Sequence, residues 1–281
     1  MEEERWIEAE SLITDEHETN DVDIGGLFDD PDPYDEFVFD FSTRQDDNDN
    51  KDDDKKKDGG ASLYRIVLHG IKQENGQTLS STGMTLWRAA PLLCRFLLLH
   101  RRSVVQGKRV LELGSGLGLC GILASQMGAS RVVLTDGDTD TLAQLRTNVH
   151  NNNNNNKQDN NNNNSIVVQQ LCWGQKLDEF QQHFGKFDLI LGADIIYVES
   201  ILEPLFETVV RLLDENNNKG RFCLAYARRN VSIDLVLECA TRFQLTWTTE
   251  PVPHDDDNDN NINNDYPHNR GECVYVFSRM K

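Results

Sequence analysis

The sequence of 281 residues lacks features that mark several classes of protein. Its longest apolar run, PLLCRFLLLH at residues 91–100, is too short to span a bilayer, which takes about 20 residues. The first residues, MEEERWIEAE, are acidic and lack the basic-then-apolar order of a secretory signal. These absences favour a cytoplasmic protein that binds no membrane, with entry into the nucleus left open.

Basic residues are scarce in this chain. It has 28 Lys and Arg against 47 Asp and Glu, a formal net charge of −19. Residues 1–60 hold 23 of the acidic residues and only 6 basic ones, so residues 61–281 are nearly neutral, with 24 acidic against 22 basic. No basic stripe is present that could displace counterions from phosphates. We therefore expect no nucleic-acid partner.

The cysteines are few and scattered, and no C-x-x-C pair occurs among them. The six are Cys94, Cys120, Cys172, Cys223, Cys239 and Cys273. Their apolar surroundings favour reduced core thiols in an intracellular protein over a disulfide framework or a zinc site. No metal site is predicted.

Three segments have compositions that do not favour a folded core. Residues 1–60 are rich in acid and cannot bury enough apolar surface to offset chain entropy, so we expect them to be disordered. Within them FDDPDPYDEFVFDF, residues 28–41, has two interpretations: it docks on the body or a partner, or it belongs to the disordered tail. The Asn/Asp-rich tracts 151–164 and 255–265 are predicted to be surface loop inserts. One folded domain is then expected at 61–281.

The remaining chain alternates strand-like and helix-like segments. Strands are predicted at 63–71, 109–113, 131–135, 166–171, 187–192, 220–226, 243–249 and 272–278, and helices at 87–100, 118–127, 139–149, 201–213 and 231–242. Such alternation predicts an α/β fold with a mostly parallel, doubly wound sheet. The two consecutive C-terminal strands predict a closing antiparallel hairpin.

The stretch RVLELGSGLGLCGILA, residues 109–124, predicts a strand, a glycine turn and a helix. Two motifs overlap in it. From Gly116 it is the G-x-G-x-x-G of dinucleotide-binding proteins, but this reading leaves Gly114 and Ser115 between strand and motif. From Glu112 it matches the first motif of S-adenosylmethionine-dependent methyltransferases and leaves no residue over. That register also explains Glu112, a carboxylate in an apolar strand that a cationic ligand would satisfy.

Ligands of doubly wound sheets bind beyond the carboxyl ends of the strands. There Asp136 either accepts hydrogen bonds from ribose hydroxyls or is a turn residue, and Asp138 is predicted to cap the next helix. Trp173 either flanks an adenine ring or belongs to the core. After the strand at 187–192, Asp194 and Tyr197 are either functional or a helix cap and a packing residue.

Five motifs, in this order, resemble the non-SET, seven-β-strand (class I) protein lysine methyltransferases over roughly residues 63–281. They are a Trp in TGMTLWRAA, VLELGSGLGLCGI, VVLTDGD, a Trp in LCWG, and Asp-x-x-Tyr in DLILGADIIY. The resemblance implies a Rossmann-like class I fold with seven strands and S-adenosyl-L-methionine as cofactor. It implies cofactor contacts from Trp87, Glu112, Gly114, Ser115, Gly116, Asp136, Trp173 and Ala193, and catalytic roles for Asp194 and Tyr197.

The same resemblance implies methyl transfer to a protein side chain, with the lysine ε-amine as acceptor. Asp194 would hold and orient the amine, and Tyr197 would close the channel. A small-molecule methyltransferase shares the cofactor half and stays an alternative, as do, more remotely, an NAD-dependent oxidoreductase and a catalytically silent binding module. The expected partner is a protein substrate, and a monomer is expected.

Overall fold

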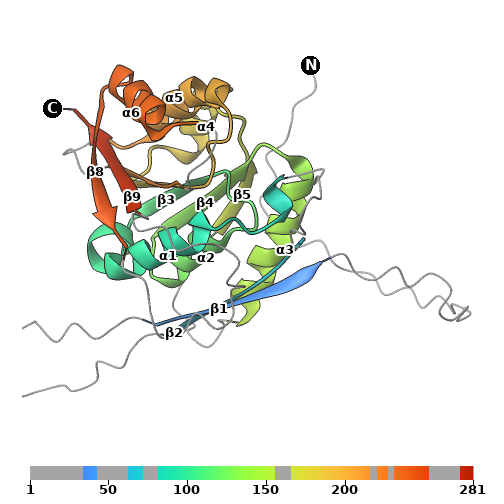
Figure 1. Ribbon diagram of the computed structural model, residues 1–281. Helices are drawn as coiled ribbons and strands as arrows, with labels where there is room; N and C mark the ends of the chain where they lie inside the picture. The colour runs from blue at the N-terminus through green and yellow to red at the C-terminus, as the bar shows by residue number, and fades with distance from the viewer. Residues whose placement is uncertain are drawn as a thin grey trace, which may run out of the picture.

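The computed structural model describes residues 34–42, 63–71, 82–155, 166–215, 220–226, 231–252 and 273–280. A seven-stranded sheet lies at its centre, with helices on both faces (Figure 1). The strands are β1 (Asp35–Ser42), β2 (Leu63–Gly70), β3 (Arg109–Leu113), β4 (Arg131–Asp136), β5 (Ile166–Gln170), β6 (Leu189–Ala193), β7 (Arg221–Ala225), β8 (Leu245–Pro251) and β9 (Cys273–Arg279). No helix within these ranges is long and apolar enough to cross a membrane.

The helices connect successive strands. They are α1 (Ala89–Leu99), α2 (Leu119–Gln126), α3 (Thr139–Asn155), α4 (Leu177–Phe184), α5 (Leu202–Leu212) and α6 (Ile233–Arg242), together with short turns η1 (Thr82–Met84), η2 (Arg101–Val105) and η3 (Glu199–Ile201). The sequence predicted all of these strands except β1, and all of the α-helices except α4.

The sheet order is β5-β4-β3-β6-β7-β9-β8. β3 pairs in parallel with β4 on one side and with β6 on the other, so the chain reverses its direction across the sheet between these two strands. Ligands of doubly wound sheets bind at such a switch point. β9 lies antiparallel between β7 and β8, which confirms the predicted closing hairpin.

The core lies on both faces of the sheet. Val110 of β3 belongs to the cluster under α1, α2 and α3, whereas Leu111 and Leu113 belong to the cluster under α4, α5 and α6. Strands buried on both faces are continuous apolar runs, which is why the predicted bounds of β3 match the observed ones. α4 was missed because only Leu177, Phe180 and Phe184 of its eight residues are buried and polar residues separate them.

β1 confirms that part of residues 28–41 docks on the body, and for Asp35–Ser42 it corrects the expectation that residues 1–60 are disordered. It pairs antiparallel with β2, with Asp35 opposite Gly70 and Ser42 opposite Leu63, in a separate two-stranded sheet. Phe37, Phe39 and Phe41 alternate along β1 and pack partly buried against the core, so this short segment gains the apolar burial that the acidic composition hides. The rest of residues 1–60 lies outside the described residues, and so does the tract 255–265.

α3 corrects the expectation for the tract 151–164. The helix was predicted to end at residue 149 but continues to Asn155, and Asn152 is buried. The Asn152 side chain accepts a hydrogen bond from Val67 N–H (3.0 Å) and donates one to Val67 C=O (2.7 Å). Asn148, one turn earlier, makes the same two bonds with His69 (2.9 and 3.1 Å). These amides bond the backbone N–H and C=O groups at the edge of β2 as a neighbouring strand would. Residues 156–164 lie outside the described residues.

The amide contacts on β2 predict a stability difference between two neighbouring asparagines. Asn152→Ala leaves the N–H and C=O of Val67 without their partner and should lower the free energy of unfolding by about 1–3 kcal/mol. Asn153→Ala is the matched control, because Asn153 is exposed on the same turn and should cost far less. Urea denaturation of both variants measures the difference. Equal stability of the two would show that the amide contacts contribute nothing.

Candidate cofactor and acceptor site

The turn after β3 is built from glycines in left-handed conformations. Gly114, Gly116 and Gly118 have φ values of 60°, 51° and 92°, which side-chain-bearing residues rarely adopt. A Cβ at Gly116 would lie 3.2 Å from the carbonyl oxygen of Gly83, and one at Gly118 would lie 2.5 Å from Cδ1 of Leu145. The turn therefore needs glycine both for its dihedral angles and for its close neighbours. Gly114 directly follows β3, as the methyltransferase register requires.

Ser115 fixes the turn to β4. Its N–H donates to the carbonyl of Thr135 (2.8 Å), and its hydroxyl oxygen accepts a hydrogen bond from the N–H of Thr135 (3.0 Å). The Thr135 hydroxyl donates in turn to the carbonyl of Glu112 (2.7 Å). The Ser115 side chain is thus used to join the ends of β3 and β4. Its predicted contact with the cofactor stays a prediction.

Asp136, the last residue of β4, holds the glycine turn from the other side. One carboxylate oxygen accepts a hydrogen bond from Gly116 N–H and the other from Asp138 N–H, both at 3.1 Å. Burial raises the pKa of Asp136, while these backbone hydrogen bonds act to lower it. Asp138 accepts hydrogen bonds from the N–H (3.0 Å) and hydroxyl (2.7 Å) of Thr141, which confirms its predicted role as the cap of α3.

Glu112 is a buried carboxyl group at the mouth of β3, with 3% of its surface exposed. Its Oε2 accepts a hydrogen bond from Gly121 N–H (3.0 Å) in the first turn of α2. Burial raises the pKa of Glu112 to about 8, an effect that the Gly121 bond opposes and the charge of Asp136 increases. A cation in the adjoining pocket would favour the ionised form.

A small pocket of about 30 Å³ lies over the glycine turn and brings together most of the predicted site residues. Among those predicted, Trp87, Glu112, Gly114, Ser115, Gly116 and Ala193 line it. The indole N–H of Trp87 donates to the carbonyl of Thr82 (2.8 Å), which fixes the ring beside η1. The pocket also includes residues that the sequence analysis missed: Thr85, Leu86, Ala90, Leu117, Gly118 and Leu119. In the sequence, these residues lie close to Trp87 or between the motif glycines, and this nearness could have identified them as pocket residues.

Trp173 and Asp194 lie next to this pocket without lining it. A Cβ at Gly114 would lie 3.5 Å from Cζ2 of Trp173, and Trp173 also packs on the core. The core packing of Trp173 is therefore present, and its role beside an adenine ring stays a prediction. Asp194 follows Ala193 directly, is 7% exposed, and has φ 58°. Its N–H donates to the carbonyl of Ala225 (3.0 Å) on the neighbouring strand β7.

Asp194 does not stand at the N-cap position of either helical segment that follows it. The residue that precedes η3 is Val198 and the one that precedes α5 is Ile201, and neither makes a side-chain capping bond. Asp194 is therefore not the cap of this helix. The next residue, Ile195, packs closely on the glycine turn, because a Cβ at Gly114 would lie 2.9 Å from Cγ2 of Ile195. Asp194 is therefore held close to that turn. Tyr197, by contrast, is 50% exposed at the surface.

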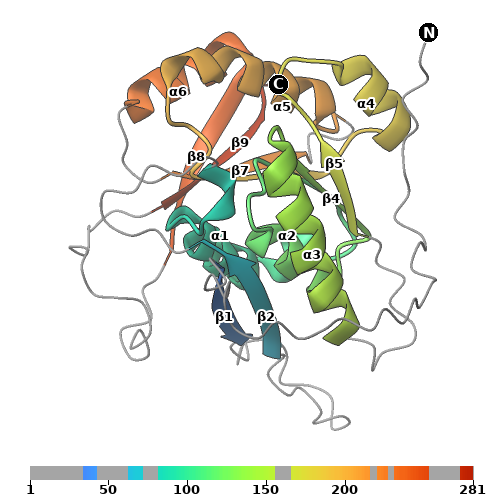
Figure 2. The ribbon, with the colours of Figure 1, turned by 90° about the vertical axis from the view of Figure 1, so that its right-hand side faces the viewer.

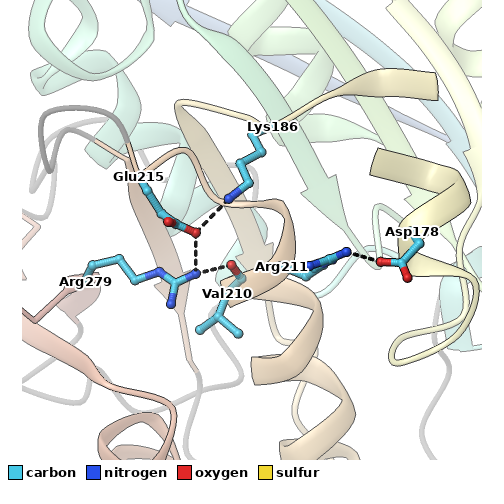
Figure 3. Close-up of polar contacts among 6 residues, drawn as sticks. All are labelled: Asp178, Lys186, Val210, Arg211, Glu215 and Arg279. Atoms are coloured by element: carbon cyan, nitrogen blue, oxygen red, sulfur yellow. Dashed lines mark hydrogen bonds and ion pairs between the residues drawn. The ribbon is translucent and has the colours of Figure 1, made fainter. Parts of the chain in front are cut away.

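The described residues form a larger hollow elsewhere, of about 650 Å³, between α4, α5 and the end of β9. Figure 3 shows ion pairs among five of its charged side chains. Glu215 forms ion pairs with Lys186 (2.7 Å) and Arg279 (3.1 Å). Arg211 forms an ion pair with Asp178. Lys186 lowers the pKa of Glu215. This hollow lies away from the switch point, and its charges are already balanced, so we do not assign the cofactor to it.

The pocket residues fit S-adenosylmethionine. Beside the glycine turn, Glu112 presents a buried carboxyl group that a sulfonium or ammonium group would satisfy. The N–H groups of Gly116 and Gly121 already donate to Asp136 and Glu112, so they are not free to bind the pyrophosphate of a dinucleotide. The geometry therefore agrees with the methyltransferase register and opposes the dinucleotide one.

Sequence comparisons agree with this geometry. A family model described as lysine methyltransferase matches residues 69–240. The chain is 37% identical over 149 residues to protein N-lysine methyltransferase METTL21A of Danio rerio, a match covering 53% of this chain and 64% of that protein. It is 33% identical to METTL21A of Mus musculus over 63% of this chain and 74% of that protein. With protein-lysine N-methyltransferase EFM3 of Chaetomium thermophilum it shares 32% identity over 62% of this chain and 52% of that protein.

The chain thus spans between about half and three quarters of the length of these relatives. Among solved structures, SMU.776, a methyltransferase complexed with SAH, superposes with a TM-score of 0.52 at 15% identity, over 76% of this chain and 53% of that one. A SAM-dependent methyltransferase from Agrobacterium tumefaciens gives 0.50 at 9% identity, over 77% of this chain and 68% of that one. At these identities the likeness shows the fold, which is that of class I methyltransferases. Because the family model covers more than half of its residues, the chain belongs to the lysine methyltransferase family.

Proposed function

We propose that the protein transfers a methyl group from S-adenosylmethionine to a lysine ε-amine of a protein substrate. The observation that carries this proposal is the position of Asp194. It is a buried carboxylate beside Ala193, which lines the cofactor pocket, and it lies at the carboxyl end of the switch-point strand β6. The named relatives, which are protein lysine methyltransferases, support the acceptor class.

The chemistry divides between cofactor and protein. The bound cofactor supplies a methyl group on a sulfonium, which is activated toward nucleophilic displacement. The protein must bring a neutral amine into line, although a lysine is mostly protonated near neutral pH. Asp194 attracts the ammonium form and orients the amine once its proton has been lost to solvent.

The backbone at Asp194 is suited to this task. Its left-handed conformation is uncommon for a residue with a side chain, and aspartate and asparagine tolerate it better than most. Ile195 and Ile196 are buried, and their packing holds this conformation in place. Backbone strain that persists at a strand end is a feature of functional sites, which supports the catalytic role of Asp194.

The surface next to Asp194 favours a protein over a small molecule as the acceptor. Tyr197 and Val198 are 50% and 46% exposed, so a large substrate can reach them. In this proposal Tyr197 contacts the incoming side chain at the surface. The proposal also retains a protein partner and a cytoplasmic location.

The deciding experiment supplies methyl-labelled S-adenosylmethionine and the purified protein to a cell extract. Label in the protein fraction, located on lysine by peptide mass spectrometry, is the expected result. Label only in the metabolite fraction would favour the small-molecule alternative. No transfer into either fraction, although the cofactor raises the melting temperature, would indicate a binding protein without activity.

The proposed role of Asp194 predicts a loss of turnover without a loss of fold. Asp194→Asn keeps the size and the tolerated backbone conformation but removes the charge, so methylation should fall on the order of a hundredfold. Cofactor affinity and melting temperature should stay near those of the wild type. Asp234→Asn, exposed on α6, is the matched control and should keep full activity. Normal turnover in the Asp194 variant would remove it from the catalytic assignment.

The raised pKa of Glu112 predicts a pH dependence of cofactor binding. Below about pH 8 the cofactor-free protein holds Glu112 protonated. A cationic cofactor favours the ionised form, so binding must then release a proton, and affinity should rise with pH by at most about tenfold per unit. The rise should end near pH 8, where Glu112 is already ionised.

Glu112→Gln provides the comparison for this pH effect, because it removes the titrating group and leaves an oxygen to accept from Gly121. The ratio of wild-type to variant affinity for S-adenosylmethionine, measured by calorimetry, should therefore increase up to about pH 8 and then level off. The ratio also cancels the titration of the cofactor itself. A ratio that does not change with pH would mean that Glu112 does not interact with the bound cation.

A further inference from the structure

The two-stranded sheet of β1 and β2 has one edge covered by α3. Asn148 and Asn152 bond the N–H and C=O groups of His69 and Val67, and Gln144 Nε2 adds a bond to His69 C=O (2.9 Å). Figure 2 shows β2 between α3 and β1. Among the described residues no strand pairs with the opposite edge, which belongs to β1.

The pairing register identifies the backbone groups on this open edge. Val38 lies opposite Val67, and Glu36 lies opposite His69. Val67 and His69 direct their N–H and C=O groups at α3, so both pairs are of the non-hydrogen-bonded kind, in which each residue points its polar groups away from the other strand. The N–H and C=O groups of Glu36 and Val38 therefore point outward from β1. No strand in the described part of the chain pairs with them.

The side chains along this edge carry negative charge. Glu36, Val38 and Asp40 are exposed on the same face of β1, and Asp40 pairs with Arg65 at 3.1 Å. A second copy of this chain would bring acidic residues against acidic residues, which disfavours self-association. An extended segment with basic residues flanking an apolar one would instead meet Glu36, Val38 and Asp40 with matching side chains.

The open edge leads toward the cofactor pocket. Asp35 begins β1 opposite Gly70. A Cβ at Gly70 would lie 2.5 Å from Cδ1 of Leu117, which lines the pocket. The next residue, Ile71, donates its N–H to the carbonyl of Met84 (2.7 Å), one residue before the pocket residue Thr85. A segment extended along β1 toward Asp35 therefore approaches the rim of the pocket.

We propose that the outer edge of β1 binds the protein substrate as an added β-strand, through a basic segment near the lysine to be methylated. Main-chain hydrogen bonds to Glu36 and Val38 supply affinity, and the acidic side chains select a basic sequence. The identity of the bound segment as substrate rests on the proposed function. The edge itself can be tested without activity.

The test uses the full-length protein and a synthetic peptide with the central sequence Lys-Thr-Val-Thr-Lys. Amide hydrogen exchange, followed residue by residue, is the readout. Added peptide should slow exchange at Glu36 and Val38 at least about tenfold, whereas Phe37 and Phe39, whose N–H groups already face β2, should change little. A peptide with the central sequence Glu-Thr-Val-Thr-Glu is the control and should have no effect.

Two variants of one residue test the main-chain contact. Val38→Pro removes an N–H that β2 does not use, so the fold should survive, as the melting temperature will show, while peptide binding should weaken at least about tenfold. Val38→Thr keeps the N–H and a β-branched side chain and should bind normally.

Several results would overturn the proposal. They are equal binding by the two Val38 variants, binding that leaves the Glu36 and Val38 amides unprotected, or no binding up to about 1 mM. Protection without peptide, accompanied by dimerisation, would assign the edge to a second copy. Edge protection in a protein that transfers no methyl group would contradict the proposed function alone.

Discussion

The site depends on the close contact between backbone segments around the glycine turn. The turn after β3 lies so close to η1 that a Cβ at Gly116 would reach the Gly83 carbonyl, and so close to the segment after β6 that one at Gly114 would overlap Ile195. This crowding excludes a side chain at both positions, and their left-handed φ angles favour glycine as well. It also brings Trp87, Glu112 and Ala193 to one pocket from three separate parts of the chain.

The carboxyl groups around this turn act on both the backbone and the ligand. Glu112 accepts the Gly121 N–H at the start of α2, and Asp136 accepts the Gly116 N–H within the turn. Each thereby fixes the loop in the shape that opens the pocket. Burial raises the pKa of both groups, that of Glu112 to about 8, so a nearby cation would favour the charged form of each. The same two buried carboxyl groups thus hold the loop in shape and favour a cationic ligand.

The sequence predicts the central part of the fold well, because there local pattern and tertiary contact agree. β3 is buried on both faces, and its apolar run defines its bounds. The glycine spacing and the acidic residues at the strand ends predict the pocket, since parallel strands end at one edge of the sheet. Thr85 and Leu117 could not be predicted as pocket residues, because their place there depends on how η1 packs against the turn.

The failures occur where a tertiary contact outweighs composition. Residues 1–60 are acidic as a whole, yet three alternating phenylalanines in Asp35–Ser42 suffice to place β1 on the core once β2 is available as a partner. The charge of the region hides this local pattern of period two. An acidic region can therefore contain a strand whose apolar side chains pack on the core while its acidic side chains stay exposed.

The asparagine-rich end of α3 shows how a repetitive composition can contain residues with specific contacts. Asn148 and Asn152 are one helical turn apart, so both face β2, and their amides fit its exposed N–H and C=O groups. Asn148 also donates to the carbonyl of Leu117 (3.1 Å), a residue of the cofactor pocket. A helix that sequence alone ends at residue 149 therefore continues because its side chains replace a missing strand. Asn148 of α3 bonds both β2 and the glycine turn, so it holds the two-stranded sheet of β1 and β2 next to that turn. The position of β1 relative to the pocket is therefore fixed by hydrogen bonds as well as by packing.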